Sequence, residues 1–196
     1  MIDKRDYRTF MRAHRRDYVL SQPETARQAT EAITRIVLEL IKNDFPLENN
    51  PRIAGYWTMG QEVDALPIMR ALLKKGYKLL LPKARGTDTN LSFCEWNDDV
   101  EMEESDLGFL YPTSPPIKYI PNLVVVPLVA FDRRGYRLGY GKGHYDKTLD
   151  ILRQKDPTVQ TLGLAYSIQQ VDELPTEAHD IKLDCVATEE GIIRFT

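Results

Sequence analysis

An apolar run that leads into a glycine-dense loop constrains the fold of this chain more than any other feature. Residues 123–129 are apolar throughout, and glycines then recur between positions 135 and 143. The run predicts a buried strand, and a helix is predicted after the loop, from Asp146 to about Lys155. Glycine has no side chain and tolerates positive φ, so successive backbone N–H groups can converge on an anion. A strand, a glycine loop and a helix in this order are typical of phosphate binding in α/β proteins.

Predicted strands and helices alternate along the chain. Strands are expected at 53–57, 77–82, 91–96, 123–129, 161–166, 184–188 and 192–195, and helices at 3–19, 21–43, 64–74 and 146–155. Residues 98–121 are acidic and then rich in proline, which predicts a surface loop with a short strand at most. The β-α-β unit over residues 53–82 should have a right-handed crossover. This alternation predicts a layered α/β/α fold around a mostly parallel central sheet.

Two of the predicted helices begin at recognisable caps. Ser21 is followed by Pro23 and Glu24, and a serine with a glutamate three residues later forms a capping box. Asp64 is placed to cap the next helix, and Gly76 should end that helix. These signals predict where the second and third helices begin.

The composition excludes several classes of function. The 196-residue chain has 28% charged residues and a formal net charge of −3, which disfavours general nucleic-acid binding. No apolar run approaches the roughly 20 residues of a membrane span, and the N-terminus is charged from Asp3 onward, unlike a secretory signal. Cys94 and Cys185 have neither CxxC nor zinc-ligand spacing, which favours a reducing compartment. We therefore expect a single domain over residues 1–196, in the cytoplasm, with no nucleic-acid or membrane partner.

The glycine loop departs from the two common phosphate-binding motifs. Gly143 follows Lys142 where a Walker A motif has Ser or Thr, and the third glycine of a dinucleotide fingerprint is missing from its place. A tight, solvent-exposed loop is therefore an alternative. The neighbouring charges favour phosphate, because Arg137 and Lys142 can neutralise an anion and Asp146 can hold Mg²⁺.

A second cationic feature lies in the first predicted helix. Basic residues recur there every four positions and form one stripe along the helix, made of Lys4, Arg8, Arg12 and Arg16. Like charges at this spacing repel one another. Either nearby aspartates compensate them on a solvated face, or an anionic ligand docks against the first turn.

Trp57 and Glu62 follow a predicted strand and precede a helix, at the edge where open α/β sheets bind ligands. Trp57 offers a flat stacking face, and Glu62 can accept hydrogen bonds from the N–H donors of a heterocycle. A tryptophan in the core and a solvated glutamate are the alternatives.

Further polar residues lie near the C-terminus. Asp184 enters a short buried strand and needs a partner, either a cap or a metal ion. His179 and Asp180 form either an acid–base couple or, more simply, a loop-anchoring hydrogen bond. Tyr166 and Gln169 follow a strand end and have no predicted role.

Together these segments resemble the 5-formyltetrahydrofolate cyclo-ligase family, whose members are also called 5,10-methenyltetrahydrofolate synthetases. The resemblance covers nearly the whole chain. It rests on Lys4 with Arg8, the Gly-Gln-Glu-Val-Asp turn at 60–64, the long motif at 131–146, and the segments 171–175, 179–180 and 183–184. It implies the α/β/α fold shared with sugar-phosphate isomerases and CoA-transferases (NagB/RpiA/CoA-transferase-like).

The resemblance implies an ATP- and Mg²⁺-dependent conversion of 5-formyltetrahydrofolate into 5,10-methenyltetrahydrofolate, with release of ADP and phosphate. The formyl oxygen would attack the γ-phosphate of ATP, and N10 of the folate would then close on the activated carbon. Phosphorylation turns the formyl oxygen into a good leaving group, so the protein need mainly align the reactants and screen charge. The expected substrates are ATP and 5-formyltetrahydrofolate, with or without a polyglutamate tail, and the expected state is a monomer.

The resemblance also implies roles for single residues. ATP would be bound by Lys4, Arg8, Arg137, Leu138, Gly139, Tyr140, Gly141, Lys142, Gly143, His144 and Tyr145. The folate would be bound by Trp57, Glu62, Tyr140, Gly141, Lys142, Gly143 and His144. Asp146 and Asp184 would hold Mg²⁺, and the catalytic residues would be Arg137, Lys142 and His144. Arg12 and Arg16 match no site residue of the family, so the solvated-face alternative stays for them.

His144 departs from the family pattern, which usually has an aromatic residue, most often tyrosine, at this position. Histidine titrates near neutrality, so His144 could help to orient or discharge the phosphorylated intermediate. Other functions stay open beside the cyclo-ligase: a non-catalytic module that binds folate or nucleotide, a relative of the sugar-phosphate isomerases or acyl-transferases, and RNA binding by the basic first helix.

Overall fold

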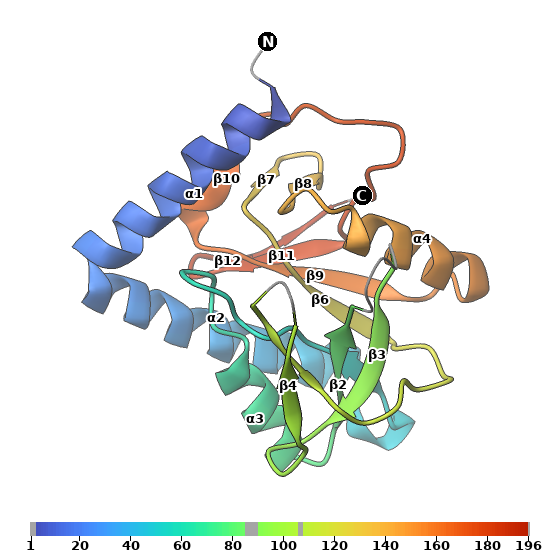
Figure 1. Cartoon of the computed structure of the whole chain (residues 1–196). Coiled ribbons are helices and arrows are strands. Elements are labelled where there is room, and N and C mark those ends of the chain that lie inside the picture. The colour runs from blue at the N-terminus through green and yellow to red at the C-terminus, as the bar shows by residue number, and fades with distance from the viewer. Residues whose placement is uncertain (1–2, 85–89, 106–107, 196) are drawn as a thin grey trace.

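The computed structural model describes residues 3–84, 90–105 and 108–195, and a single large sheet runs through its centre (Figure 1). The described residues form this seven-stranded sheet in the order β12-β11-β9-β6-β1-β2-β3. Its strands are β1 (Arg52–Ala54), β2 (Lys78–Lys83), β3 (Ser92–Trp96), β6 (Leu123–Pro127), β9 (Gln160–Leu164), β11 (Cys185–Thr188) and β12 (Gly191–Arg194). Strands β11 to β2 pair in parallel, while β3 and β12 pair antiparallel at the two edges. The predicted mostly parallel sheet is confirmed.

Helices cover both faces of this sheet. α2 (Pro23–Asp44) and α3 (Leu66–Lys74) share a buried core with one set of strand residues, which includes Val125. α4 (His144–Lys155) contributes Leu149 to a second core, which includes Val124. Successive strand residues point to opposite faces of a sheet, so the two cores lie on opposite sides. The layered α/β/α architecture is confirmed, and α3 connects the parallel strands β1 and β2 as predicted.

α1 (Lys4–Ser21) extends past one end of the sheet and carries the N-terminal basic stripe (Figure 1). Its C-terminal half packs on α2. Met11, near its middle, is buried in a small separate core with Val129 and Leu138. Because Leu138 lies at the start of the glycine loop, this core holds α1 against that loop.

The segment between β6 and the glycine loop contains a hairpin that was not predicted. β7 (Ala130–Asp132) pairs antiparallel with β8 (Arg137–Leu138), and β10 (Gln170–Val171) completes a small sheet on the other side of β7. The strand predicted over 123–129 therefore ends at Pro127. Strands of 2 or 3 residues leave almost no periodicity to read in a sequence.

The acidic, proline-rich region also has more structure than expected. It contains the antiparallel strands β4 (Met102–Glu104) and β5 (Leu110–Pro112), where a loop with a short strand was predicted over 98–121. Short 3₁₀ turns occur at Leu47–Asn49 and Ser167–Gln169.

The predicted capping box at Ser21 is wrong. Ser21 is the last residue of α1, and its hydroxyl donates to the carbonyl of Asp17, one turn back in the same helix. α2 begins at Pro23, and its N-cap residue Gln22 makes no side-chain capping bond. The serine hydroxyl was free to bond in either direction, and the preceding helix offered a carbonyl at the right distance.

The other caps are close to the prediction. Asp64 accepts a hydrogen bond from the backbone N–H of Leu66, the first residue of α3, at 3.0 Å. Gly76 has φ of +90° and follows the end of α3, as expected of a glycine stop.

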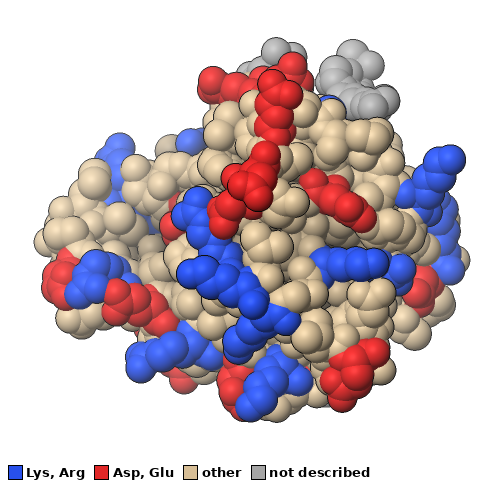
Figure 2. All heavy atoms as spheres, turned by 90° about the horizontal axis from the view of Figure 1, so that it is seen from below, with Lys and Arg blue, Asp and Glu red and all other residues tan. Residues whose placement is uncertain are grey.

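None of the described helices is long and apolar enough to cross a membrane. On the face shown in Figure 2, basic and acidic side chains are interspersed. Charges of opposite sign at such short separations partly cancel each other's field.

Candidate active site

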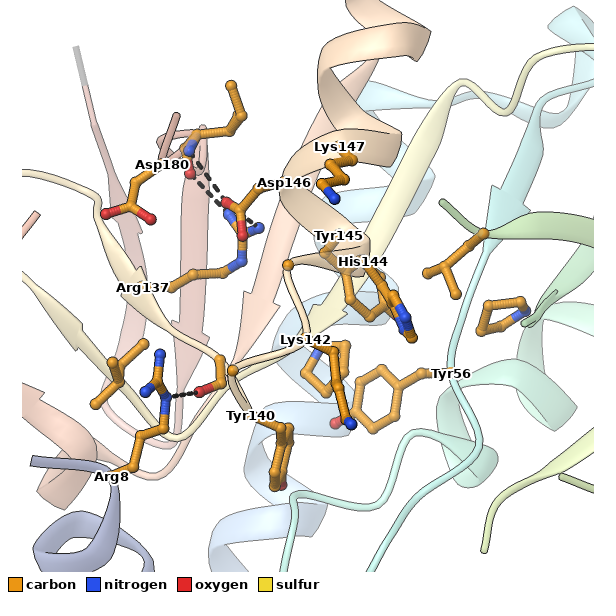
Figure 3. A pocket seen from close by; sticks show the side chains of 18 of the residues that line it. Arg8, Tyr56, Arg137, Tyr140, Lys142, His144, Tyr145, Asp146, Lys147 and Asp180 are labelled. Carbon is orange, nitrogen blue, oxygen red and sulfur yellow. Dashed lines mark hydrogen bonds and ion pairs between the residues drawn. The ribbon is translucent and has the colours of Figure 1, made fainter. Parts of the chain in front are cut away.

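One cavity of about 950 Å³ opens at the carboxyl ends of the central strands (Figure 3). Tyr56 and Trp57 follow β1, while Pro82 and Pro127 lie at the ends of β2 and β6, and all four line it. This is the edge of the sheet where open α/β folds bind ligands.

The cavity collects nearly all the residues that the sequence analysis singled out. Its lining includes Lys4, Arg8, Trp57, Glu62, Arg137, Leu138, Gly139, Tyr140, Gly141, Lys142, Gly143, His144, Tyr145 and Asp146. Asp184 is not among the lining residues. Segments far apart in the sequence therefore meet at one place.

The glycine loop forms the turn between β8 and α4. Gly141 and Gly143 have φ of +93° and +67°, a region that other residues rarely adopt. The Arg8 Nε donates to the carbonyl of Gly139 at 2.9 Å, which ties α1 to the loop. A Cβ at Gly141 would lie 3.3 Å from the Arg8 guanidinium carbon. The loop thus needs glycine at Gly141 both for its backbone and for the approach of Arg8.

The same loop leads into the N-terminus of α4. Gly143, the last glycine of the loop, is the N-cap of α4, and no side-chain hydrogen bond caps the helix there. The first N–H groups of a helix have no partner within the helix and carry partial positive charge, so they favour anions. Lys142 also lines the cavity and makes no hydrogen bond or ion pair with the described residues. This end of the cavity is suited to phosphate.

Arg137 and Asp146 form a buried ion pair beside the loop. The Arg137 guanidinium lies 2.7 Å from Asp146 Oδ1, and its side chain is 3% exposed. The same guanidinium donates to the carbonyl of Ile181, and the N–H of Ile181 donates to Asp146 Oδ1 (Figure 3). Burial lowers the pKa of Arg137, and the charge of Asp146 opposes that shift. Asp146 lines the cavity, and its Oδ2 accepts no hydrogen bond from the described residues.

Asp180 belongs to this site, which the sequence analysis did not predict. It lines the cavity next to Ile181, and its carboxylate lies 2.7 Å from Lys4 Nζ. Lys4 also pairs with Glu177 at 2.9 Å. Burial tends to lower the pKa of Lys4, but the hydrogen bonds and charges of Asp180 and Glu177 outweigh it and raise that pKa.

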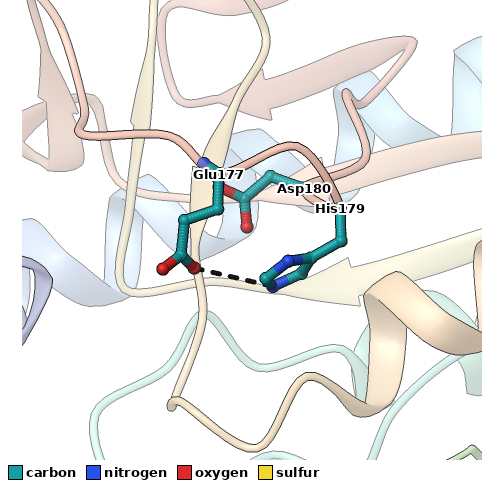
Figure 4. A group of neighbouring side chains, drawn as sticks. All are labelled: Glu177, His179 and Asp180. Carbon is teal, nitrogen blue, oxygen red and sulfur yellow. Dashed lines mark hydrogen bonds and ion pairs between the residues drawn. The ribbon is translucent and has the colours of Figure 1, made fainter.

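The loop-anchoring alternative for Asp180 is confirmed. Its Oδ2 accepts a hydrogen bond from the backbone N–H of Glu177 at 2.7 Å. His179 is exposed, and its Nε2 lies 3.5 Å from the Glu177 carboxylate (Figure 4). Ligand-type atoms of Glu177, His179 and Asp180 lie within 4.8 Å of one another.

Asp184 lies at the amino ends of the parallel strands, whereas the cavity opens at their carboxyl ends. It directly precedes β11, and its Oδ2 accepts from the Thr161 N–H at 2.7 Å and from Arg153 at 2.7 Å. Thr161 pairs with Val124, whereas Pro127, which lines the cavity, lies three strand residues further on, roughly 10 Å away. Asp146 lines the cavity and Asp184 does not, so the predicted role of Asp184 in holding Mg²⁺ has no support from the cavity and stays a prediction.

Glu62 is buried at the cavity wall, and each of its carboxylate oxygens accepts one hydrogen bond. It is 7% exposed, its Oε2 accepts from the N–H of Met59 at 2.8 Å, and its Oε1 accepts from the Tyr140 hydroxyl. Burial raises the pKa of Glu62, and these hydrogen bonds together with the charges of Arg15 and Arg12 oppose the shift. The solvated-glutamate alternative is wrong. Trp57 is half-buried at the cavity wall rather than inside the core.

Arg15 is a buried residue of this site that the sequence analysis missed. It is 5% exposed, and it donates to the Leu128 carbonyl at 3.0 Å and to the Tyr140 hydroxyl at 2.9 Å. Gln169, which had no predicted role, donates to the same Leu128 carbonyl. Nothing in the local sequence distinguishes Arg15 from the other basic residues of α1.

The basic stripe on α1 divides between the cavity and solvent. Arg12 is exposed, as the solvated-face alternative predicts, and it also lines the cavity, with its guanidinium carbon 5.7 Å from the centre of the Tyr140 ring. Arg16 is exposed and pairs with Asp17 at 3.2 Å, as that alternative predicts.

His144 is the first residue of α4 and is partly exposed at the cavity wall. Burial and the nearby charges of Lys142 and Lys147 lower its pKa below the ordinary value of 6.5. These effects favour the neutral form of the His144 ring.

Comparison with known proteins points to one family. The model described as the 5-formyltetrahydrofolate cyclo-ligase family matches residues 1–189. A 5-formyltetrahydrofolate cyclo-ligase of Haemophilus influenzae is 32% identical over 161 residues, which cover 80% of this chain and 83% of the relative. One of Escherichia coli is 31% identical over 141 residues, which cover 69% of this chain and 76% of the relative.

A solved structure agrees with the sequence relatives. The NMR structure of Aquifex aeolicus 5,10-methenyltetrahydrofolate synthetase has a TM-score of 0.76 and 29% identity, and the match covers 97% of this chain and 92% of that one. The likeness extends through the whole described fold.

Proposed function

Because this chain belongs to the 5-formyltetrahydrofolate cyclo-ligase family, we propose that its cavity carries out that family's reaction, with ATP along the glycine loop and the folate against Glu62. The enzyme converts 5-formyltetrahydrofolate into 5,10-methenyltetrahydrofolate and consumes ATP. The observation that carries the proposal is that a phosphate-type loop and a buried carboxylate suited to a heterocycle line one cavity. We propose that residues 1–196 form a single cyclo-ligase domain.

The phosphate end is proposed to lie against the loop and the N-terminus of α4. Arg8 and the backbone N–H groups of residues 139–144 would surround the polyphosphate, and Lys142 is available to contact its terminal group. Lys4 can exchange one anionic partner, Asp180, for another, a phosphate oxygen. These groups neutralise the charge that develops as the γ-phosphoryl group is transferred.

The reaction proceeds in two displacements under this proposal. The formyl oxygen bonds to the γ-phosphorus while the bond from that phosphorus to ADP breaks. N10 then bonds to the formyl carbon, and the carbon–oxygen bond breaks to release phosphate, while N10 loses its proton. Alignment of the two substrates is the main contribution of the protein, because the first step is an in-line transfer of the phosphoryl group and the second is an addition of N10 to the formyl carbon followed by loss of phosphate, both between bound groups. His144 lies between the two ends, and in its neutral form it can accept a hydrogen bond from N10.

Asp146 and Asp180 are proposed to be the carboxylates for Mg²⁺. Both residues line the cavity, Asp146 Oδ2 accepts no hydrogen bond from the described residues, and Asp180 directly precedes Ile181, whose N–H donates to Asp146 Oδ1. Carboxylate oxygens next to a phosphate site fit the preference of Mg²⁺ for a few protein oxygens together with substrate phosphates. When bound, Mg²⁺ supplies positive charge to the phosphate oxygens. This assignment replaces Asp184 with Asp180.

The folate end is proposed to use Glu62 and Trp57. The Glu62 carboxylate offers acceptor oxygens to the N–H groups of the pterin ring, and the indole of Trp57 offers a stacking face. The cytoplasmic location, the monomeric state and the binding of polyglutamylated folate are parts of the same proposal. The reducing-compartment pattern of the cysteines supports the first of these.

The test is to incubate the purified protein with 5-formyltetrahydrofolate, ATP and Mg²⁺ and to follow the near-ultraviolet absorbance of the methenyl product together with ADP release. We expect one ADP for each product formed and no reaction without ATP. Lys142→Met should lose most turnover, whereas Lys155→Met, at the exposed end of α4, should retain it. Folded protein that produces no absorbance change would refute the proposal.

A further inference from the structure

A chain of hydrogen bonds runs from α1 through the glycine loop to the folate end of the cavity. The Arg15 guanidinium donates to the Tyr140 hydroxyl at 2.9 Å, and that hydroxyl donates to Glu62 Oε1. The three side chains come from three separate parts of the chain and meet only in the folded protein.

The donor and acceptor roles in this chain of hydrogen bonds follow from the chemistry of the guanidinium. A guanidinium can donate hydrogen bonds but cannot accept them, so the Tyr140 oxygen must be the acceptor toward Arg15. The single hydroxyl proton of Tyr140 is then left for Glu62. Arg15 thus keeps Glu62 in the role of acceptor, and it holds the Tyr140 ring against the cavity wall.

The burial of Arg15 costs free energy of folding, which suggests that it serves a function. Its side chain is almost fully buried, and its Nε has no hydrogen-bond partner among the described residues. A buried guanidinium loses its hydration, and an unpaired buried N–H adds to that cost. Exposed neighbours such as Arg16 avoid this cost.

We propose that Arg15 is a positioning residue for folate binding, acting through the Tyr140 hydroxyl to hold Glu62 in place as an acceptor for the N–H groups of the pterin ring. The inference rests on the proposed function, which assigns Glu62 to the folate. It concerns the folate end alone, because Arg15 makes no hydrogen bond to the loop atoms that are proposed to hold phosphate.

The test compares Arg15→Met, Tyr140→Phe and the double variant with wild type. The dissociation constant of 5-formyltetrahydrofolate is measured without ATP from tryptophan fluorescence, and the KM for ATP is measured separately. Each single variant should weaken folate binding about tenfold, as expected for a hydrogen bond to a charged group. The double variant should also weaken it about tenfold rather than a hundredfold, because both changes break the same chain. For Arg15→Met, the KM for ATP should stay within about twofold.

Arg16→Met is the matched control, since Arg16 neighbours Arg15 on α1 but is exposed and does not line the cavity. It should bind folate like wild type. Unchanged folate affinity in Arg15→Met, or an additive double variant, overturns the inference. If Arg15→Met fails to fold, Tyr140→Phe decides alone, because it removes only a hydroxyl, and unchanged folate affinity then overturns the inference.

The proposed function is judged by a different measurement. If the wild-type protein binds folate but forms no methenyl product, the proposed reaction is refuted. The role of Arg15 is then judged from the folate dissociation constants of the variants alone. Wild-type protein that does not bind folate overturns both.

Discussion

Arg137 and Asp146 face each other across the start and end of the glycine loop, with 2.7 Å between guanidinium and carboxylate. The pair occupies one oxygen of Asp146, and the other accepts no hydrogen bond from the described residues. The loop between them is therefore closed by an ion pair at its base. The same pair fixes the position of Asp146 near the proposed phosphate end.

Asp146→Asn should abolish most turnover while leaving folate binding nearly intact. An amide keeps the hydrogen bond from Ile181 but loses the charge that a metal ion needs. We expect kcat to fall about a hundredfold, equivalent to about 3 kcal/mol of transition-state stabilisation. Steady-state kinetics and a folate binding titration measure the two effects. Equal losses in kcat and in folate affinity would contradict the assignment.

Asp180→Asn and Asp184→Asn should fail in different ways. Asp180→Asn should raise the Mg²⁺ concentration for half-maximal rate about tenfold, because it removes a proposed ligand. Asp184→Asn should instead lower the free energy of unfolding by about 1–2 kcal/mol, because it weakens bonds to Thr161 and Arg153, with kcat within about threefold. Magnesium titrations and thermal unfolding of both variants provide the comparison. A magnesium defect in Asp184→Asn alone would restore the original assignment.

The acidic limb of kcat should depend on His144. Its pKa lies below 6.5, so the neutral ring is lost as the pH falls through that lowered value. If the neutral ring takes part, wild-type kcat declines on that side, and His144→Phe has a lower kcat that stays flat with pH. The rate at saturating substrates between about pH 5 and pH 8 tests this, because saturation removes the effect of Glu62 titration on folate binding. An identical acidic limb in the variant would exclude His144 from the chemistry.

Gly141→Ala should be destabilising, and Gly139→Ala should not be. Gly141 has φ of +93° and a Cβ there would press on Arg8, whereas a Cβ at Gly139 meets no atom within 4 Å. Left-handed backbone costs an alanine about 1–2 kcal/mol. Chemical denaturation of the two variants measures the difference. Equal stability would mean that the loop does not need this backbone conformation.

Much of the phosphate end could be predicted from the sequence because its residues are contiguous. From Arg137 to Asp146 the chain supplies the loop glycines, the cations and a carboxylate in one stretch. Local geometry then decides most of their arrangement. The start of α4 at His144, rather than at Asp146, moved the boundary by two residues without moving the site.

Asp180 and Asp184 show where such prediction ends. Both precede the short strand β11, and three residues lie between them in the sequence. Whether each aspartate lies at the amino ends or at the carboxyl ends of the parallel strands depends on where β11 begins. Strand ends are poorly marked in a sequence. The error at Ser21 has the same origin, since a serine between two helices can bond to either one.

Arg15 could not be found from sequence for a different reason. Its burial depends on the hairpin of β7 and β8, which holds Leu138 against α1. That hairpin has strands of 2 or 3 residues, too short to give a pattern. A buried arginine in a helix rich in exposed basic residues has no local signature.

The single helix α1 reaches both ends of the cavity. Lys4 lies beside Asp180, and Arg15 lies beside Tyr140. The two helix residues are roughly three helical turns, or about 16 Å, apart. Because a helix barely stretches, its backbone holds the proposed phosphate site and the proposed pterin site at a constant separation. Removing one residue between them would turn one contact about 100° away from its target and leave the other in place. The length of one helix thus sets the separation of the proposed sites for two chemically unrelated ligands.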